Sequence, residues 1–474
     1  MKFALRSVVT AFLAVAFTAT AFAQWSSDPA VNLPLADNNN GSDQVQPKLV
    51  PIHGDGWYVS WFDANPSTPP PIGYDVFYQR LTAAGVEKLP HDGQIVADLT
   101  NSSTEDYGLD IDTSNNALLA FLDTRENRNN QQVTGTRLPP LGKPIWGRLG
   151  VQLTPPSDLN FHAAPKIVGT SDGSVVVAWT ENSSVVLQKL NAAGQPQWGS
   201  GVVFSESSYS YLLADLHAAD NGSVIVSWVR EQGFGSDMQL RANKVSSSGA
   251  LLWGSANVDI FDVGSLQFGN FPYFVYDGNG GAVFSWYTSV PALQVFAQHI
   301  LAAGTEAFPH NGAAVSSNSL NVRVEPTATY RAATQEVFVF WTEEDSNQVL
   351  NGVYGQKFNS TGAPQWGADG LVIVPLGADQ QIFVTAVPIG TGALTFWVDQ
   401  AGFGSSTIRA TRIAGGGATV CPQFPVSSTP SNKARLAAAI SQAGITALVF
   451  EDDRIGNNGI YIQNVNPDCT LGPQ

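Results

Sequence analysis

Apolar and polar residues along this chain come in short runs that recur in a fixed order. An apolar strand leads into a turn of Gly, Asp or Asn, a second strand that ends in an aromatic residue, a polar loop, a third strand, and a Gly turn before a fourth strand. Short runs rich in Val, Ile and aromatic residues between Gly-bearing turns are typical of hairpins. No helical period persists long enough to compete. The pattern therefore predicts an all-β protein of four-stranded antiparallel units.

The aromatic residue that ends the second strand marks the period of this pattern. It recurs eight times, 49 to 60 residues apart, at Trp61, Phe121, Trp179, Trp228, Trp286, Trp341, Trp397 and Phe450. Radial repetition of four-stranded units is typical of a β-propeller. We expect one eight-bladed propeller domain over residues 24–474, with blades that begin near residues 47, 106, 163, 211, 271, 324, 381 and 434. A seven-bladed ring with an extra hairpin is the competing count.

The last repeat lacks a fourth strand, and the first residues after position 23 resemble one. Residues 25–33, which begin with Trp25, match the fourth-strand phrase that begins with Trp198, and Trp366 occupies the same slot. We expect residues 24–35 to form a closing strand that pairs with the last blade and removes an open sheet edge. The corresponding residue of the seventh repeat is Cys421.

The start of the chain reads as an export signal. Lys2 and Arg6 precede an apolar run from Val8 to Phe22, and Ala21-Phe22-Ala23 fits a cleavage site after Ala23. No later stretch approaches the roughly 20 apolar residues that a membrane helix needs. The sequence thus predicts a secreted or periplasmic protein. In that setting Cys421 and Cys469 favour a disulfide over two free thiols.

The net negative charge of the protein limits the classes of partner that it can bind. The chain has 39 acidic and 23 basic residues; without Lys2 and Arg6 the basic count is 21, so the processed chain carries −18. This balance opposes binding to nucleic acid or to an anionic membrane surface. A protein or a glycan remains as the partner, and we expect a monomer.

An acidic residue stands two positions after the period-marking aromatic in six of the eight repeats. These residues, the acidic ring, are Asp63, Asp123, Glu181, Glu343, Asp399 and Asp452. They could bind a cation or a basic ligand. The structural alternative is that they cap loops or pair locally, as Asp123 with Arg125 and Asp452 with Arg454. We expect no cofactor, with Ca²⁺ at acid-rich loops such as residues 343–345 as the alternative.

Other chemistry-bearing patterns are few. Phe234 and Phe403 stand at the tips of two Gly-flanked loops, where they could grip a sugar or a protein, or could pack over a neighbouring blade. His91 and His310 occupy matching slots in repeats on opposite sides of the ring, so they cannot share a metal. HExxH and Cys–His motifs do not occur. We therefore assign no catalytic residue and no metal ligand from sequence.

The repeat resembles the tandem repeats of uncharacterised secreted bacterial β-propeller proteins, of the form GGxxxxWxDxR followed by YxQRLNAxGxxxWG. The likeness spans the chain after position 23 and lies in residues 277–286, 452–454, 78–81 and 191–199. It implies a propeller and export, and brings no activity with it. The sequence thus favours a non-enzymatic binding or scaffold propeller with variable loops on one face. The alternative is a carbohydrate-active hydrolase with loop carboxylates at the channel mouth.

Overall fold

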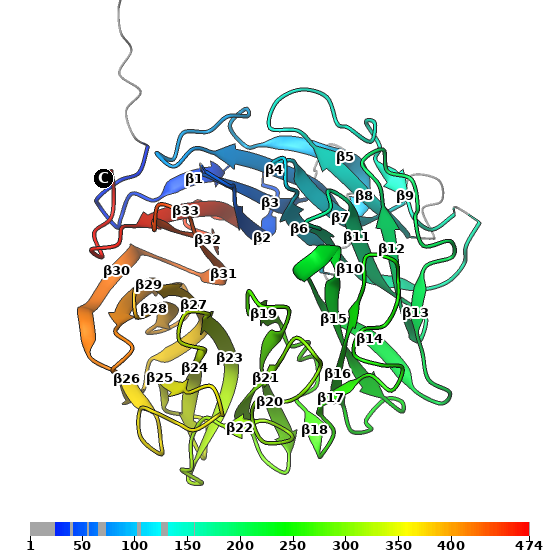
Figure 1. Cartoon of the computed structure of the whole chain (residues 1–474). Helices are drawn as coiled ribbons and strands as arrows, with labels where there is room; N and C mark the ends of the chain where they lie inside the picture. Colours follow the sequence, from blue (N-terminus) through cyan, green and yellow to red (C-terminus); the bar gives the residue numbers. More distant parts are fainter. Residues whose placement is uncertain are drawn as a thin grey trace, which may run out of the picture.

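The protein is an eight-bladed β-propeller. The computed structural model describes residues 24–473 except 38–40, 55, 65–72, 102–105, 125–130 and 156, so the expected export signal lies outside the described residues. Eight antiparallel sheets stand radially around one axis (Figure 1). In the described residues, helical structure is confined to the short turn η1 (Asp220–Gly222), so no helix there could span a membrane. The predicted fold class is confirmed.

Each blade is a four-stranded meander whose first strand is nearest the axis. Blades one to four comprise β2 (Gln44–Pro51), β3 (Trp57–Asp63), β4 (Tyr74–Leu81) and β5 (Gln94–Asn101); β6 (Gly108–Ile111), β7 (Ala117–Asp123), β8 (Gln132–Leu138) and β9 (Val151–Gln152); β10 (His162–Gly169), β11 (Val175–Glu181), β12 (Ser184–Leu190) and β13 (Val202–Phe204); β14 (Ser210–Ala218), β15 (Val224–Glu231), β16 (Gln239–Val245) and β17 (Val258–Phe261).

The remaining blades follow the same plan, except that the first strand of blade five is split into β18 and β19. Blades five to eight comprise β18 (Ser265–Leu266), β19 (Phe274–Tyr276), β20 (Ala282–Val290), β21 (Gln294–Ile300) and β22 (Ala313–Ala314); β23 (Asn321–Arg331), β24 (Glu336–Asp345), β25 (Asn351–Phe358) and β26 (Leu371–Gly377); β27 (Gln380–Ile389), β28 (Gly392–Gln400), β29 (Ser406–Ile413) and β30 (Thr419–Ser431); β31 (Lys433–Ile440), β32 (Thr446–Asp452), β33 (Gly459–Val465) and β1 (Leu33–Ala36).

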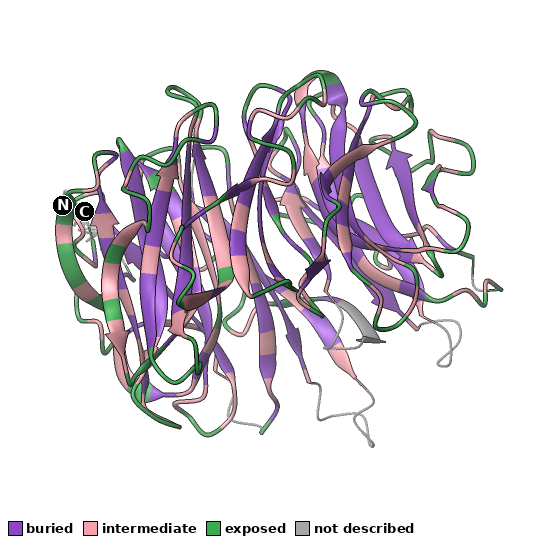
Figure 2. Ribbon diagram, turned by 90° about the horizontal axis from the view of Figure 1, so that it is seen from below, coloured by how far each residue is buried: buried purple, intermediate pink, exposed green. Residues whose placement is uncertain are grey.

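The core lies between the blades. Because each sheet is covered on both sides, second strands such as β3 and β7 are buried at every position. Figure 2 shows buried residues along the strands throughout the ring. The chain connections alternate between the two faces of the ring. One face, which we call the loop face, carries the loops between second and third strands and the connections that lead from each blade to the next. The inner strands begin at this face.

Strand β1 closes the ring as predicted. Leu33 pairs with Ile462 and Pro34 with Tyr461, which completes the sheet of blade eight (Figure 1). The indole Nε1 of Trp25 donates to the backbone oxygen of Ala83 in blade one at 2.7 Å, just as Trp253 donates to Ala302 at 3.0 Å. Trp25 therefore occupies the slot that the repeat assigned to it, and the count of eight blades is confirmed.

A disulfide joins Cys421 of β30 to Cys469, which follows β33. In six other blades this position places an aromatic residue against a turn glycine of the next blade. At Gly85, which has φ +76°, an added Cβ would lie 2.7 Å from the Trp25 ring. Cys469 stands in the equivalent turn with a similar φ of 70°. Between blades seven and eight, the covalent bond thus replaces the recurring aromatic–glycine contact.

Candidate functional site

The acidic ring lies at the loop-face ends of the second strands, and each member bonds within its own blade. Asp63 accepts from Ser42, Asp123 from Thr134, Glu181 from Trp179, Glu343 from Trp341, Asp399 from Gln381, and Asp452 from Arg454. The predicted Asp452–Arg454 pair is present at 2.5 Å, whereas Arg125 lies outside the described residues. These contacts are those of the structural alternative, in which the acids fasten their own loops.

The two loop aromatics are almost fully exposed. Phe234 and Phe403 are each 94% exposed, so neither is buried against a neighbouring blade. Phe234 makes only an edge contact, with its ring centre 5.8 Å from that of Phe268 in blade five. Further exposed apolar side chains lie on the same face, in the loops and blade connections: Leu159, Phe161, Phe271, Leu320, Val349 and Ile455. The loop face is therefore a surface with many unburied apolar groups.

A charged cavity of about 600 Å³ lies on the axis of the ring. Its walls come from the inner strands of blades one to five and blade eight, and a second cavity of about 500 Å³ adjoins it along Tyr273 and Arg435. Most inner strands are bulged near their start, with a residue in the left-handed region, such as Gln46 (φ 56°) or Arg435 (φ 53°). A bulge re-aims the side chains around it. These bulges lie where the strands line the cavities.

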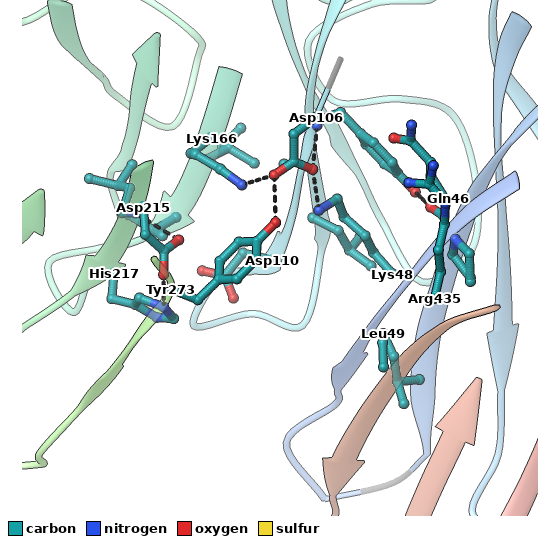
Figure 3. Close-up of a pocket in the computed structure, with 18 of the residues that line it drawn as sticks. Gln46, Lys48, Leu49, Asp106, Asp110, Lys166, Asp215, His217, Tyr273 and Arg435 are labelled. Atoms are coloured by element: carbon teal, nitrogen blue, oxygen red, sulfur yellow. Dashed lines mark hydrogen bonds and ion pairs between the residues drawn. The ribbon is translucent and has the colours of Figure 1, made fainter. Parts of the chain in front are cut away.

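Asp106 of blade two joins three other blades in this cavity (Figure 3). One carboxylate oxygen lies 2.6 Å from Lys48 Nζ of blade one, and the other forms an ion pair with Lys166 of blade three. The hydroxyl of Tyr273, from blade five, donates to Asp106 at 3.0 Å. Lys166 also lies over the Tyr273 ring, 4.9 Å from its centre. We call Lys48, Asp106, Lys166 and Tyr273 the axial cluster.

Asp106 and Lys166 stabilise each other's charged forms in the axial cluster. Burial by itself would raise the pKa of Asp106, but Lys166 and Lys48 hold it well below its ordinary value. Burial likewise opposes the charge on Lys166, yet Asp106 and Tyr273 raise its pKa. For Lys48 the balance is the reverse: burial lowers its pKa and so does Lys166, although Asp106 opposes them. The cluster thus gathers two lysine amines and one carboxylate in a protein whose formal net charge is −16. Such a group can donate several hydrogen bonds to hydroxyl or carboxylate oxygens.

Three further titratable side chains, Asp110, Asp215 and His217, line the same cavity. Asp215 Oδ2 is 3.1 Å from His217 Nε2, and this neighbour raises the pKa of His217 although burial opposes it. Burial raises the pKa of Asp110 to about 6, although the backbone N–H of Gly169 donates to its carboxylate at 2.9 Å. A carboxyl group that is partly protonated near neutral pH can exchange protons with a ligand.

Sequence reasoning missed the whole axial cluster. A signal existed, because Lys48 and Lys166 stand at the same register position of their inner strands, each between a proline and two apolar residues. Each lysine pairs across the ladder with the residue just before the period-marking aromatic. At the position of these lysines, blade seven has Thr385 and blade eight has Ala437. The sequence does not show that Asp106 and Tyr273, 167 residues apart, meet on the axis.

These features define a propeller with a charged cavity on its axis. No protein-family model matches the chain, and no curated protein matches it. Among solved structures it is similar to a polysaccharide lyase of family PL25, an ulvan lyase (10% identity, TM-score 0.49, 82% of this chain and 97% of that one). It is also similar to the GH93 α-L-arabinofuranosidase of Fusarium graminearum (11%, 0.37, 64% and 92%) and to a eukaryotic initiation factor (11%, 0.45, 93% and 89%). These similarities are too distant to carry an argument about activity.

Proposed function

We propose that this is an exported binding propeller that recognises a carbohydrate chain on its loop face, with one end of the chain in the charged cavity. The axial cluster is the observation that carries this proposal. It gathers charged groups from blades one to three, and a phenol from blade five, around a space of about 600 Å³. Ligand sites typically enclose volumes of about 300–1,000 Å³ with a few convergent polar groups.

The loop-face aromatics support the same ligand class. Sugar rings present apolar C–H faces as well as hydroxyl groups, so they suit a surface where exposed rings adjoin polar donors. Tyr273 is 60% exposed and belongs to the axial cluster, and Phe271 lines the adjoining cavity. A carbohydrate chain that leaves the cavity towards blades four and five would meet Phe268 and Phe234, whose rings contact each other.

A carbohydrate-active enzyme is the second candidate function, and Asp110 is the observation that favours it. General acids in glycoside and uronate chemistry need a carboxyl group that holds its proton near neutral pH. The pKa of Asp110, raised by burial to about 6, keeps part of its population protonated near neutral pH, whereas the acids of the acidic ring are bound within their own blades. We therefore locate any catalytic carboxyl group in the cavity rather than in the acidic ring.

The decisive experiment combines a glycan array of neutral and uronic-acid oligosaccharides with a product assay on every bound glycan. Lys166→Met and Tyr273→Phe remove one donor each from the axial cluster. Lys357→Met is the matched control, because Lys357 makes a similar 2.8 Å ion pair with Glu336 in the third strand of blade six. We expect at least a tenfold loss of glycan affinity in both cluster variants and none in the control.

Two results would refute the binding proposal: no glycan bound by the wild type, or equal losses in K166M and K357M. Product formation would instead establish the second candidate. In that case Asp110→Asn should abolish turnover and leave affinity within a few fold, since an amide can still donate a hydrogen bond but cannot transfer a proton.

A further inference from the structure

A buried histidine on the loop face of blade three has one ring nitrogen without a hydrogen-bond partner. The side chain of His162, the first residue of β10, is 0% exposed, and its Nδ1 lies 2.9 Å from the backbone oxygen of Gln131. That oxygen can only accept, so Nδ1 carries the proton, and a neutral imidazole then has its lone pair on Nε2. Within the described part of the chain, no group makes a hydrogen bond to this Nε2.

Two carboxylates face the same nitrogen. Asp158 Oδ2 lies 3.4 Å from His162 Nε2, and Glu181 Oε2 lies 3.6 Å from it. The three residues each offer one ligand atom, and these atoms lie within 4.8 Å of one another. Atoms that share one metal ion, with bonds of about 2.0–2.2 Å, stand at such distances from each other. The spacing suits ligands around a common ion better than direct hydrogen bonds.

The fold holds all three groups in place. Glu181 is the cross-strand partner of His162 in the β10–β11 ladder, so their relative position is set by register. Trp179 Nε1 donates to Glu181 Oε2 at 3.1 Å, and the backbone N–H of Asn160 donates to Asp158 Oδ1 at 2.9 Å. Outer contacts of this kind, together with the Nδ1–carbonyl bond, orient the ligands of metal sites.

We propose that Asp158, His162 and Glu181 bind a divalent transition-metal ion of the Zn²⁺ class. An imidazole nitrogen with two carboxylates suits Zn²⁺, whereas Ca²⁺ and Mg²⁺ take oxygen ligands. Asp158 and Glu181 are partly exposed, so an ion can reach the site and keep a water or a ligand oxygen. The ion fastens the connection that leads into blade three to the end of β11 on the loop face.

The alternative is a protonated His162 that pairs with both acids and takes no metal. Chelator-treated protein without a histidine tag distinguishes the two when it is titrated with ZnCl₂ by calorimetry and with Co²⁺ by visible absorption. His162→Asn and Glu181→Gln each remove one ligand. Glu343→Gln is the matched control, because Glu343 occupies the same strand position in blade six but pairs with Arg323 at 3.0 Å.

We expect one Zn²⁺ per chain, affinity at least tenfold weaker in E181Q and H162N, and wild-type affinity in E343Q. Circular dichroism confirms the fold of each variant; should H162N not fold, E181Q retains the test because Glu181 is partly exposed. Three results would overturn the proposal: no Zn²⁺ uptake by the wild type, undiminished uptake by E181Q, or an equal loss in E343Q, which would indicate non-specific binding to carboxylates.

Discussion

Truncation of Trp25 tests how the ring is closed. Trp25 is 4% exposed, its ring centre lies 6.0 Å from that of Trp57, and its Nε1 donates to Ala83 of blade one. The residue after it, Ser26, accepts a 2.8 Å hydrogen bond from Gln463 of β33. Trp25→Ala therefore removes the contact that holds the start of the closing segment between the last blade and the first.

The magnitude follows from burial. A buried Trp→Ala change costs about 3–5 kcal/mol through lost apolar contact and the cavity that remains. The lost hydrogen bond from the indole contributes about 1 kcal/mol to that figure. For a chain of this size, unfolding entropy of roughly 2 cal/mol/K per residue converts 4 kcal/mol into a fall of about 4 °C in melting temperature.

Trp253→Ala is the matched control, because Trp253 makes the same bond to the next blade, is similarly buried, and lies in a connection held by β16 on one side and β17 on the other. Both variants should lose similar global stability by thermal melting. Hydrogen exchange should separate them: W25A should speed exchange of the β33 amides that bond to β1, whereas W253A should leave those amides protected. The β1–β33 ladder is short, and Trp25 anchors the segment that leads into it, so the ladder opens locally once that anchor is removed.

The reasoning would be wrong if W25A melted within 1 °C of the wild type, or if β33 exchanged no faster in W25A than in W253A. Either result would mean that the β1–β33 hydrogen bonds alone close the ring.

Three further predictions concern the seam and the cavity. Replacing Cys421 and Cys469 by serine should lower the free energy of unfolding by about 4 kcal/mol on the chain-entropy model for a 48-residue separation; a reductant that leaves the melting temperature of the wild type unchanged would contradict this. Asp106→Asn leaves Lys48 and Lys166 without their shared counter-charge and should cost about 2–3 kcal/mol, partly recovered in D106N/K166M; denaturant titrations of the single and double variants measure the coupling. Because the pKa of Asp110 is raised from 3.8 to about 6, the folded state favours its protonated form. That stabilisation is full below about pH 4 and is lost as the pH rises through 6, so relative to D110N the wild type should lose stability between pH 4 and 7. The loss should be at most about 3 kcal/mol, because water in the cavity weakens the effect of burial; parallel stability–pH curves would refute the assignment.

The sequence determined the blades, their number and the closing strand, because these depend on local order. Strand alternation, turn glycines and the aromatic at each second-strand end act within about 50 residues, and every copy repeats them. The same register located Trp25 correctly, since its neighbours in space are set by the repeat itself. The sequence favoured a disulfide between Cys421 and Cys469 over two free thiols, and the structure confirms the disulfide.

Only the tertiary structure decided which side chains share a site. The acidic ring was visible as a row in the sequence, but a row cannot reveal which partners each acid has in its own blade, nor that Glu181 faces the buried His162. The axial cluster depends on ring closure, which brings Lys48, Asp106, Lys166 and Tyr273 from four blades to one axis. His162 and Glu181 face each other through one ladder register, and the bulge in β10 changes the register beyond it. A periodic sequence specifies what the blades have in common; the binding chemistry lies where single blades depart from the period and meet in space.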